Sequence, residues 1–207
     1  MLFWAVTFNL GWTATTPAVS PPTVLVLGDS LSAAYGLDLQ TGWVQQLNER
    51  LKREGYVVRL INASVSGETS LGGAQRLGAI LQRDKPQVVV IELGANDALR
   101  GLSLRELGQH LTTMIQHARQ QGAQVLLIGI DLPDNYGEEY RHALKDVYRT
   151  TARETHVELV PNLLSQVPLK EENFQADHLH PTAAMQINIV NAVIGKLKPL
   201  LPSSAHP

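Results

Sequence analysis

Two short stretches, far apart in the sequence, carry residue types that suit nucleophilic catalysis. Gly28-Asp29-Ser30 follows an apolar run, and Asp177 and His180 lie three residues apart in the stretch ADHLHP. A serine hydroxyl is a weak nucleophile until a base removes its proton, and a neutral imidazole suits that role near neutral pH. A carboxylate that accepts from the other ring nitrogen holds the imidazole in the correct tautomer. Ser30, His180 and Asp177 could therefore form a catalytic triad.

An acyl-transfer site also needs hydrogen-bond donors where the oxyanion of the tetrahedral intermediate forms. Suitable donors are the backbone N–H of Gly67 in the stretch ASVSGETS, the side-chain amide of Asn96 in GAND, and the backbone N–H of Ser30. Glycine at position 67 lets the backbone approach a substrate closely, because it has no Cβ. The sequence thus offers an oxyanion hole made of Gly67, Asn96 and Ser30.

These residues also have plainer interpretations. Taken alone, Ser30 is typical of a helix N-cap, and Asn96 is typical of a turn. Asp177, His178 and His180 could together bind zinc or iron, since imidazole and carboxylate are ligands of both metals. That alternative is disfavoured, because the sequence shows no further ligand cluster and a metal site gives the serine no role.

Two further carboxylates stand close to the candidate nucleophile. Asp29 precedes Ser30, and we expect it to hold the turn through its carboxylate rather than to act in catalysis. Glu92 lies in an apolar run, so it is expected either at the exposed end of a strand or beside a polar partner.

The elements that must position these residues follow from the periodicity of apolar residues. Apolar runs bounded by turn residues, each expected to be a strand, span residues 23–27, 57–62, 87–93, 124–130 and 157–160. Helical spacing occurs over 42–55 and over 104–122, where Gly122 is placed to end the helix. The stretch 180–200 opens on Pro181, which favours the first turn of a helix. Strands that alternate with helices need crossover connections, which predicts a parallel sheet.

The predicted fold class is therefore α/β, with three α/β/α layers and a flavodoxin-like five-stranded parallel sheet of order 2-1-3-4-5. In such sheets the functional crevice lies outside the carboxyl ends of the strands. This strand order makes the loops that carry Ser30, Gly67 and Asn96 neighbours. A last helix packed beside the first strand would bring Asp177 and His180 over them.

The composition indicates one soluble globular domain. The chain has 207 residues, of which 44% are hydrophobic and 17% charged, and its formal net charge is −2. This charge gives no electrostatic reason to expect nucleic acid or an anionic membrane as a partner. The chain has no cysteine, which excludes disulfides, thiolate catalysis and cysteine-ligated zinc.

Five sequence blocks resemble those of the SGNH, or GDSL-type, hydrolase superfamily. They are LGDSLSAAYG, NASVSGETS, ELGANDALRG, LPDNYG and DHLHP, and the resemblance covers nearly all of residues 23–200. It is strongest to a branch of secreted bacterial enzymes that act as thioesterase I, lysophospholipase and arylesterase. The resemblance implies Ser30 as nucleophile, His180 as base, Asp177 as orienting acid, and Gly67 and Asn96 as oxyanion donors. It also implies that no metal and no organic cofactor is needed.

The chain departs from the family pattern at two positions. His178 follows Asp177 where relatives commonly have glycine, and it could stiffen the loop or add a second titrating group beside the triad. Asp131 directly precedes LPDNYG and places a negative charge near the expected acyl groove. Both departures bear on which substrate is preferred.

The predicted function is that of a serine esterase or thioesterase that hydrolyses apolar acyl esters or thioesters through an acyl-enzyme intermediate. Carbohydrate acetylesterase activity is an alternative. A flavodoxin-like module that binds phosphate or nucleotide is another, but neither a Gly-x-Gly-x-x-Gly turn nor a phosphate-loop lysine follows the first strand. The candidates for lining an acyl groove, each of which could equally be a core residue, are Leu71, Leu99, Leu102, Leu132, Tyr136 and Leu179.

The first 22 residues differ in composition from the rest of the chain. MLFWAVTFNLGW is apolar and TATTPAVSPP is small, hydroxylated and proline-rich, which resembles a secretory signal peptide without its basic n-region. The apolar run is too short for a transmembrane helix. We expect a signal peptide or disordered segment over 1–22, the hydrolase domain over 23–201, and a C-terminal tail over 202–207. A periplasmic or secreted monomer is expected, acting on a small-molecule substrate; a cytoplasmic location stays open.

Overall fold

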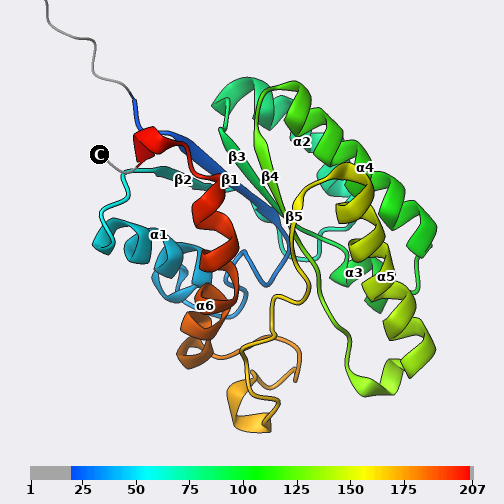
Figure 1. The fold of residues 1–207 in the computed structure, drawn as a ribbon. Helices are drawn as coiled ribbons and strands as arrows, with labels where there is room; N and C mark the ends of the chain where they lie inside the picture. Colours follow the sequence, from blue (N-terminus) through cyan, green and yellow to red (C-terminus); the bar gives the residue numbers. More distant parts are fainter. Residues whose placement is uncertain (1–19, 206–207) are drawn as a thin grey trace, which may run out of the picture.

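Five parallel strands form the centre of the computed structural model, which describes residues 20–205 (Figure 1). The strands are β1 (Thr23–Gly28), β2 (Arg59–Asn62), β3 (Val88–Glu92), β4 (Gln124–Ile128) and β5 (Glu158–Val160). Their order is β2-β1-β3-β4-β5, and every neighbouring pair is parallel. The predicted fold class and strand order are confirmed.

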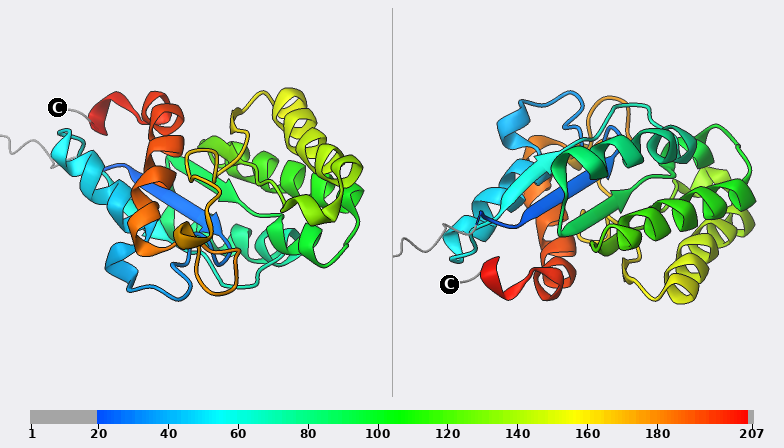
Figure 2. Two further views of the ribbon diagram at one scale, coloured as in Figure 1. Left: turned by 90° about the horizontal axis from the view of Figure 1, so that it is seen from below. Right: turned by 90° about the horizontal axis from the view of Figure 1, so that it is seen from above.

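Helices cover both faces of this sheet, which gives the three predicted layers (Figure 2). They are α1 (Trp43–Arg53) and α6 (Gln186–Leu197) on one face, α2 (Ser70–Asp84), α4 (Leu104–Gln120) and α5 (Glu138–Thr155) on the other, and the short α3 (Ala95–Leu99) after β3. None of these helices is both long enough and apolar enough to cross a membrane, a statement that covers residues 20–205.

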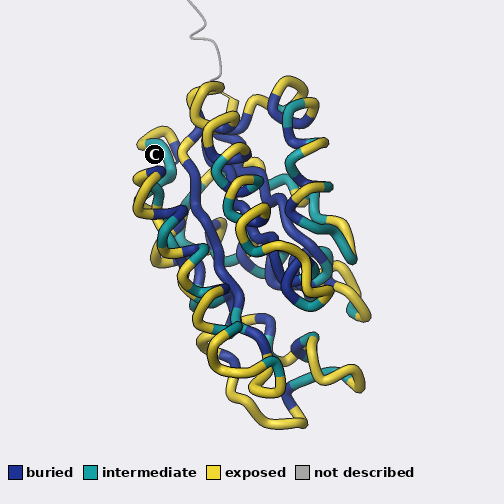
Figure 3. Tube along the Cα trace, turned by 90° about the vertical axis from the view of Figure 1, so that its right-hand side faces the viewer, coloured by how far each residue is buried: buried dark blue, intermediate teal, exposed yellow. Residues whose placement is uncertain are grey.

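The core lies on both sides of the central strands. All residues of β1 and β3 are buried, because helices pack on both faces of these near-continuous apolar runs, and buried segments run through the middle of the molecule in Figure 3. The edge strand β2 is only partly buried. Helix α4 buries the five residues that share one helical face, and it ends before Gly122, whose φ is +82°. Those residues are Leu107, Leu111, Met114, Ile115 and Ala118.

The last helix begins later than the sequence predicts. Pro181 does not open it; this residue instead forms an isolated antiparallel bridge with Phe174, and α6 starts at Gln186. The Gln186 side chain accepts from the backbone N–H of Trp43 at 3.0 Å and donates to the carbonyl of Pro181 at 3.2 Å. The long-range bond to Trp43 and the Phe174–Pro181 bridge hold residues 181–185 outside the α-helix. Helix α6 packs against α1 and β5.

Both ends of the described segment 20–205 lie at the β2 edge of the sheet. The carbonyl of Pro22 accepts from Arg59 N–H at 2.9 Å, directly before β1 begins. Residues 203–205, part of the expected tail, form a short 3-10 turn in which Ala205 is buried and accepts from Val57 N–H at 2.7 Å. Most of the expected signal segment, residues 1–19, lies outside the described residues, as do residues 206–207.

Candidate active site

The turn after β1 presents Ser30 at the carboxyl edge of the sheet. The chain bends into a helical turn there, in which Ala33 N–H donates to the Asp29 carbonyl and Tyr35 N–H to the Ser30 carbonyl. The Asp29 carboxylate accepts from the N–H of Leu31 at 3.0 Å. The hydrogen bond that would make Ser30 a capping residue is therefore made by Asp29, as expected for a residue that holds the turn. Ser30 Oγ lies 2.8 Å from His180 Nε2 instead.

A tight loop before α6 brings His180 over Ser30. The Phe174–Pro181 bridge closes this loop, and inside it Gln175 N–H donates to the His180 carbonyl at 2.7 Å. Asp177 Oδ1 accepts from the backbone N–H of Leu179 and of His180, both at 3.0 Å. Asp177 Oδ2 lies 2.7 Å from His180 Nδ1. The loop thus fixes the imidazole between a carboxylate and a hydroxyl.

The environment keeps Asp177 ionised. Burial raises its pKa, but hydrogen bonds from the backbone N–H groups of His180 and Leu179 and from the His180 ring outweigh burial and lower the pKa of Asp177 to about 2. A carboxylate beside Nδ1 favours the tautomer with the proton on that nitrogen, which leaves Nε2 free to accept a proton from Ser30. Both ring nitrogens of His180 are engaged in this way, and no group of three or more metal-ligand side chains occurs within residues 20–205.

His178 adopts the left-handed backbone conformation that its position in the loop requires. Its φ is +56°, and its N–H donates to the Gln175 carbonyl at 2.9 Å. Glycine adopts this conformation without cost, whereas a residue with a Cβ pays roughly 1 kcal/mol. The side chain lines the cleft beside Ser30 and is exposed. The backbone therefore tolerates a residue with a Cβ at this position, and His178 adds an imidazole to the cleft wall.

Gly67 and Asn96 lie on the two loops that flank Ser30. Gly67 has a φ of +79° in a turn closed by a hydrogen bond from Glu68 N–H to the Val65 carbonyl. Asn96, on α3, donates from Nδ2 to Asp29 Oδ2 at 3.2 Å. Within residues 20–205 the N–H groups of Gly67 and Ser30 donate to no acceptor. The predicted oxyanion donors thus include two backbone N–H groups that are available to a ligand.

A cleft of about 590 Å³ opens beside Ser30 and His180. The apolar side chains that line it include Leu99, Ile130, Leu132, Val167, Phe174 and Leu179. Leu99, Leu132 and Leu179 were expected there. Ile130 follows β4, and Val167 and Phe174 come from the segment 161–174, which has no strand or long helix. The apolar spacing in LLSQVPLKEENF was the available signal for that segment.

Three of the proposed groove residues lie elsewhere, which corrects the sequence-based expectation. Leu71 is the second residue of α2 and points into solvent, with 48% of its surface exposed. Tyr136 belongs to a 3-10 turn and packs against the core instead of lining the cleft. Leu102, in the loop before α4, is 45% exposed and also outside the cleft.

Several known proteins resemble this chain in sequence and in structure. Residues 26–186 match the model of the GDSL-like Lipase/Acylhydrolase family. The chain belongs to this family. It is 49% identical to the esterase TesA of Pseudomonas aeruginosa over 90% of this chain and 92% of that protein. It is 37% identical to thioesterase 1/protease 1/lysophospholipase L1 of Escherichia coli K12 over 96% and 94% of the two chains. A crystal structure of TesA is 50% identical and superposes with a TM-score of 0.85, covering 86% of this chain and 99% of that one.

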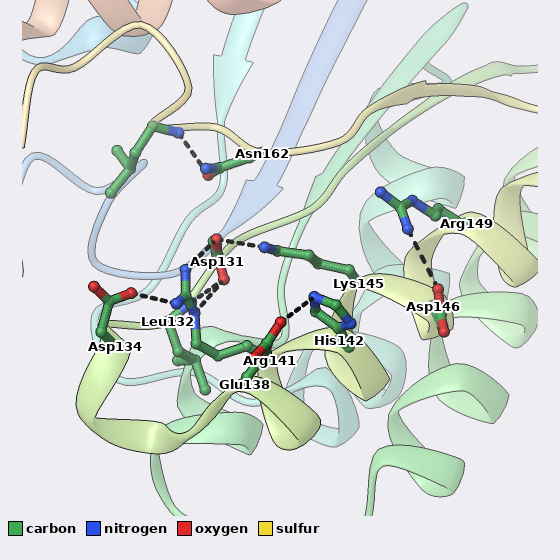
Figure 4. Close-up of polar contacts among 11 residues, drawn as sticks. Asp131, Leu132, Asp134, Glu138, Arg141, His142, Lys145, Asp146, Arg149 and Asn162 are labelled. Carbon is green, nitrogen blue, oxygen red and sulfur yellow. Dashed lines mark hydrogen bonds and ion pairs between the residues drawn. The ribbon is translucent and has the colours of Figure 1, made fainter.

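Asp131 does not present a bare charge to the cleft of this GDSL-like hydrolase. Its carboxylate accepts from Arg141 at 2.8 and 3.1 Å and from Lys145 Nζ at 2.8 Å, and Arg141 also pairs with Asp134 (Figure 4). Burial raises the pKa of Asp131, but hydrogen bonds from Arg141 and Lys145 outweigh it and lower that pKa. The negative charge expected at the cleft wall is therefore compensated by two residues of α5.

Two further carboxyl groups, those of Glu92 and Asp29, lie close to each other near the nucleophile. Glu92 is 2% exposed at the end of β3, where its Oε2 accepts from Ser32 Oγ at 2.7 Å and from Asp29 N–H at 3.4 Å. Glu92 was expected either at the exposed end of a strand or beside a polar partner, and the structure shows it buried beside a polar partner. Burial, and next the nearby Asp29, raise the pKa of Glu92 well above its usual value. Burial also raises the pKa of Asp29 to about 6.

These raised pKa values predict a pH-dependent stability. Protonated groups are favoured in the folded state, so their contribution is full below the unfolded pKa values near about 4. It is lost as pH rises through each raised pKa, which is about 6 for Asp29. Glu92→Gln keeps an oxygen acceptor for Ser32 and removes the acid. At pH 8 we expect its free energy of unfolding to exceed that of the wild type by about 1 kcal/mol.

Chemical denaturation at several pH values measures this effect. The loss of stability between about pH 4 and pH 8 should be smaller in Glu92→Gln than in the wild type. Glu106→Gln, at an exposed glutamate of α4, serves as the control and should follow the wild type. Identical pH slopes in all three proteins would contradict the expected repulsion between Glu92 and Asp29.

Proposed function

We propose that the chain is a serine hydrolase that cleaves apolar acyl esters or thioesters through an acyl-enzyme intermediate. The observation that carries the proposal is the continuous series of contacts from Ser30 Oγ through His180 to Asp177 at the edge of an apolar cleft. Membership in a lipase/acylhydrolase family supports it, as do the esterase and thioesterase names of the relatives.

The geometry supports the following sequence of steps. Ser30 Oγ attacks the carbonyl carbon of the substrate while His180 Nε2 takes the hydroxyl proton. The N–H groups of Gly67 and Ser30 and the amide of Asn96 stabilise the resulting oxyanion. The intermediate collapses, His180 returns the proton to the leaving alcohol or thiol, and Ser30 keeps the acyl group. Water, deprotonated by His180, then attacks the acyl-enzyme. The acid is released as His180 returns this proton to Ser30 Oγ, which restores the resting site.

The cleft favours an apolar acyl group over a sugar ester. Leucine, isoleucine, valine and phenylalanine side chains line part of the cleft, and burying a methylene group against them contributes about 0.8 kcal/mol. Polar side chains such as Asn162, Ser165 and Lys170 line it as well, so the preference for an apolar acyl group rests on this transfer free energy. The cleft volume of about 590 Å³ suits small to medium acyl chains.

Hydrolysis of p-nitrophenyl esters from acetyl to palmitoyl tests the proposal. We expect turnover with an optimum at small to medium chains, and turnover of the matching acyl-CoA thioester. A p-nitrophenyl alkylphosphonate should inactivate the enzyme and add its phosphonyl group to the peptide that contains Ser30. Inactivity across the series, or labelling of a different residue, would contradict the proposal.

The activity is expected to fall on acidification. A protonated imidazole cannot accept the Ser30 proton, so kcat/KM should decrease as the pH falls from about 8 to about 5. Asp177, with a pKa lowered to about 2, stays ionised throughout this range. A profile that is flat between about pH 5 and 8 would contradict the role of His180.

A second group that faces the site also titrates in this range. Asp29 accepts a hydrogen bond from Asn96, and its pKa is raised to about 6. The Asp29→Asn variant separates the two sources. It removes the titrating carboxyl group, so an acid limb that belongs to Asp29 disappears from the profile. An acid limb that remains in this variant belongs to another group of the site.

We infer further that the apolar stretch 1–22 directs export and that residues 23–201 form the hydrolase domain of a monomer. The start of β1 at Thr23 supports this boundary, and the net charge of −2 speaks against nucleic acid as a partner. Mass spectrometry of the protein recovered after expression of the full chain tests for cleavage. Light scattering of the same sample tests for the monomer. An uncleaved cytoplasmic product or a stable dimer would contradict the respective inference.

A further inference from the structure

Arg100 connects the two loops that carry the proposed oxyanion donors. It follows α3 directly, and its Nη2 donates to the Gly67 carbonyl at 2.9 Å and lies 3.5 Å from Asn96 Oδ1. Gly67 follows β2 and Asn96 follows β3, and these two strands are separated in the sheet by β1. Sheet pairing between β2 and β3 therefore does not set the distance between the two loops, and the Arg100 side chain spans it.

The contacts of Arg100 fix the orientation of the Asn96 amide. Oδ1 faces the guanidinium, while Nδ2 donates to the Asp29 carboxylate at 3.2 Å. The opposite orientation would place the amide NH₂ against a cation and the amide oxygen against a carboxylate, both of which are repulsive. With one Nδ2 proton on Asp29, the second remains available to an oxyanion.

At Gly67 the guanidinium binds the carbonyl and leaves the N–H available. A Cβ at this position would lie 3.5 Å from Arg100 Nη2, so the guanidinium packs directly on the glycine. The hydrogen bond from Glu68 N–H to the Val65 carbonyl holds the other side of the same Gly67–Glu68 peptide. Hydrogen bonds to charged groups are stronger than neutral ones, so this contact restrains the peptide that follows the donor.

The charge of Arg100 is not paired with a carboxylate in residues 20–205, in contrast to Arg76 and Arg141. An unpaired cation beside two N–H donors also favours negative charge on a bound oxyanion.

A second, buried set of hydrogen bonds joins the same two loops. Asp97 accepts from the N–H of Ser70 at 2.8 Å and from its hydroxyl at 2.5 Å. The fold around the loops therefore does not depend on Arg100.

We propose that Arg100 is a positioning residue of the oxyanion hole, which holds the Gly67 carbonyl and the Asn96 amide oxygen so that their N–H groups face the substrate carbonyl. This role rests on the proposed function. It acts on the transition state, because the oxyanion develops only there, and so it raises kcat more than it lowers KM.

Steady-state kinetics of Arg100→Met, Arg100→Lys and the control Arg105→Met test the proposal. Arg105 is an exposed arginine of α4 without an ion pair in the described residues, so its loss removes the same charge away from the site. We expect Arg100→Met to lower kcat about 10-fold with KM changed less than about twofold. Arg100→Lys should recover part of the loss, and Arg105→Met should match the wild type. The melting temperatures of all variants should agree.

A double-mutant cycle with Asn96→Ala separates positioning from a general structural effect. Asn96→Ala alone should lower kcat about 10²-fold to 10³-fold. If Arg100 acts through Asn96, Arg100→Met should cost less in the Asn96→Ala background than in the wild type. A loss that appears only in KM, a kcat equal to that of Arg105→Met, or full additivity would overturn the proposal. An unchanged kcat in Asn96→Ala would instead overturn the oxyanion hole of the proposed function.

Discussion

Replacement of Ser30 by alanine is expected to lower kcat by about 10⁶-fold, the scale seen when the nucleophile of a serine hydrolase is removed. No other hydroxyl lies within hydrogen-bond distance of His180 Nε2 in the described residues, so no neighbouring group can form the acyl-enzyme in its place. The measurement is kcat for hydrolysis of the preferred p-nitrophenyl ester. Ser204→Ala, at an exposed serine far from the cleft, is the matched control and should keep wild-type activity.

His180→Ala is expected to lower kcat by a similar factor, because the hydroxyl and the imidazole act as one unit. The double variant Ser30→Ala/His180→Ala should then be no slower than either single variant. His117→Ala, at an exposed histidine of α4, controls for the loss of an imidazole. Circular dichroism should show that all these variants are folded. Substantial turnover by folded Ser30→Ala would assign the nucleophile to another residue and overturn the proposed mechanism.

The sequence predicted those parts of the fold whose burial is set by local periodicity. The runs that became β1 and β3 are apolar without interruption, since both of their faces are covered, and α4 buries one regular helical stripe. The parallel order then followed from the alternation of strands and helices. Because the carboxyl ends of parallel strands share one edge, the same reasoning placed Ser30, Gly67 and Asn96 together.

Features that depend on tertiary contacts were not predictable in this way. Helix α6 starts at Gln186 because that side chain bonds to Trp43, which is distant in sequence. In the sequence Asp131 indicates an uncompensated negative charge, whereas in the structure Arg141 and Lys145 of α5 form ion pairs with it. The cleft wall formed by the segment 161–174 has no regular period, so its apolar residues indicate burial but not which side chains face the cleft.

The Asp177–His180 loop was predictable for a different reason. Its geometry is local, since Asp177 Oδ1 accepts from backbone N–H groups two and three residues ahead and Oδ2 faces the ring of His180. A spacing of three residues is sufficient for this arrangement. The contact of Nε2 with Ser30, which was also predicted, depends in addition on the packing of the loop over β1.

This local geometry makes Asp177→Asn an informative variant, for which we expect kcat to fall about 10⁴-fold. The amide oxygen can still accept from Leu179 N–H and His180 N–H, so the loop keeps its shape. The amide nitrogen then faces His180 Nδ1 and donates to it, which forces the ring proton onto Nε2. In that tautomer Nε2 donates toward Ser30 and cannot accept its proton.

Two readouts test this explanation against a simple loss of stability. The Nδ1 proton of His180 should give a downfield proton NMR resonance in the wild type that disappears in Asp177→Asn, while the melting temperature stays close to the wild-type value. Asp146→Asn, at an exposed aspartate of α5, is the matched control. Asp177→Ala removes the backbone acceptors as well, so it should lower both activity and loop stability. If Asp177→Asn retained wild-type kcat, tautomer control would not be the role of Asp177, and its depressed pKa would reflect only the backbone hydrogen bonds that hold the loop.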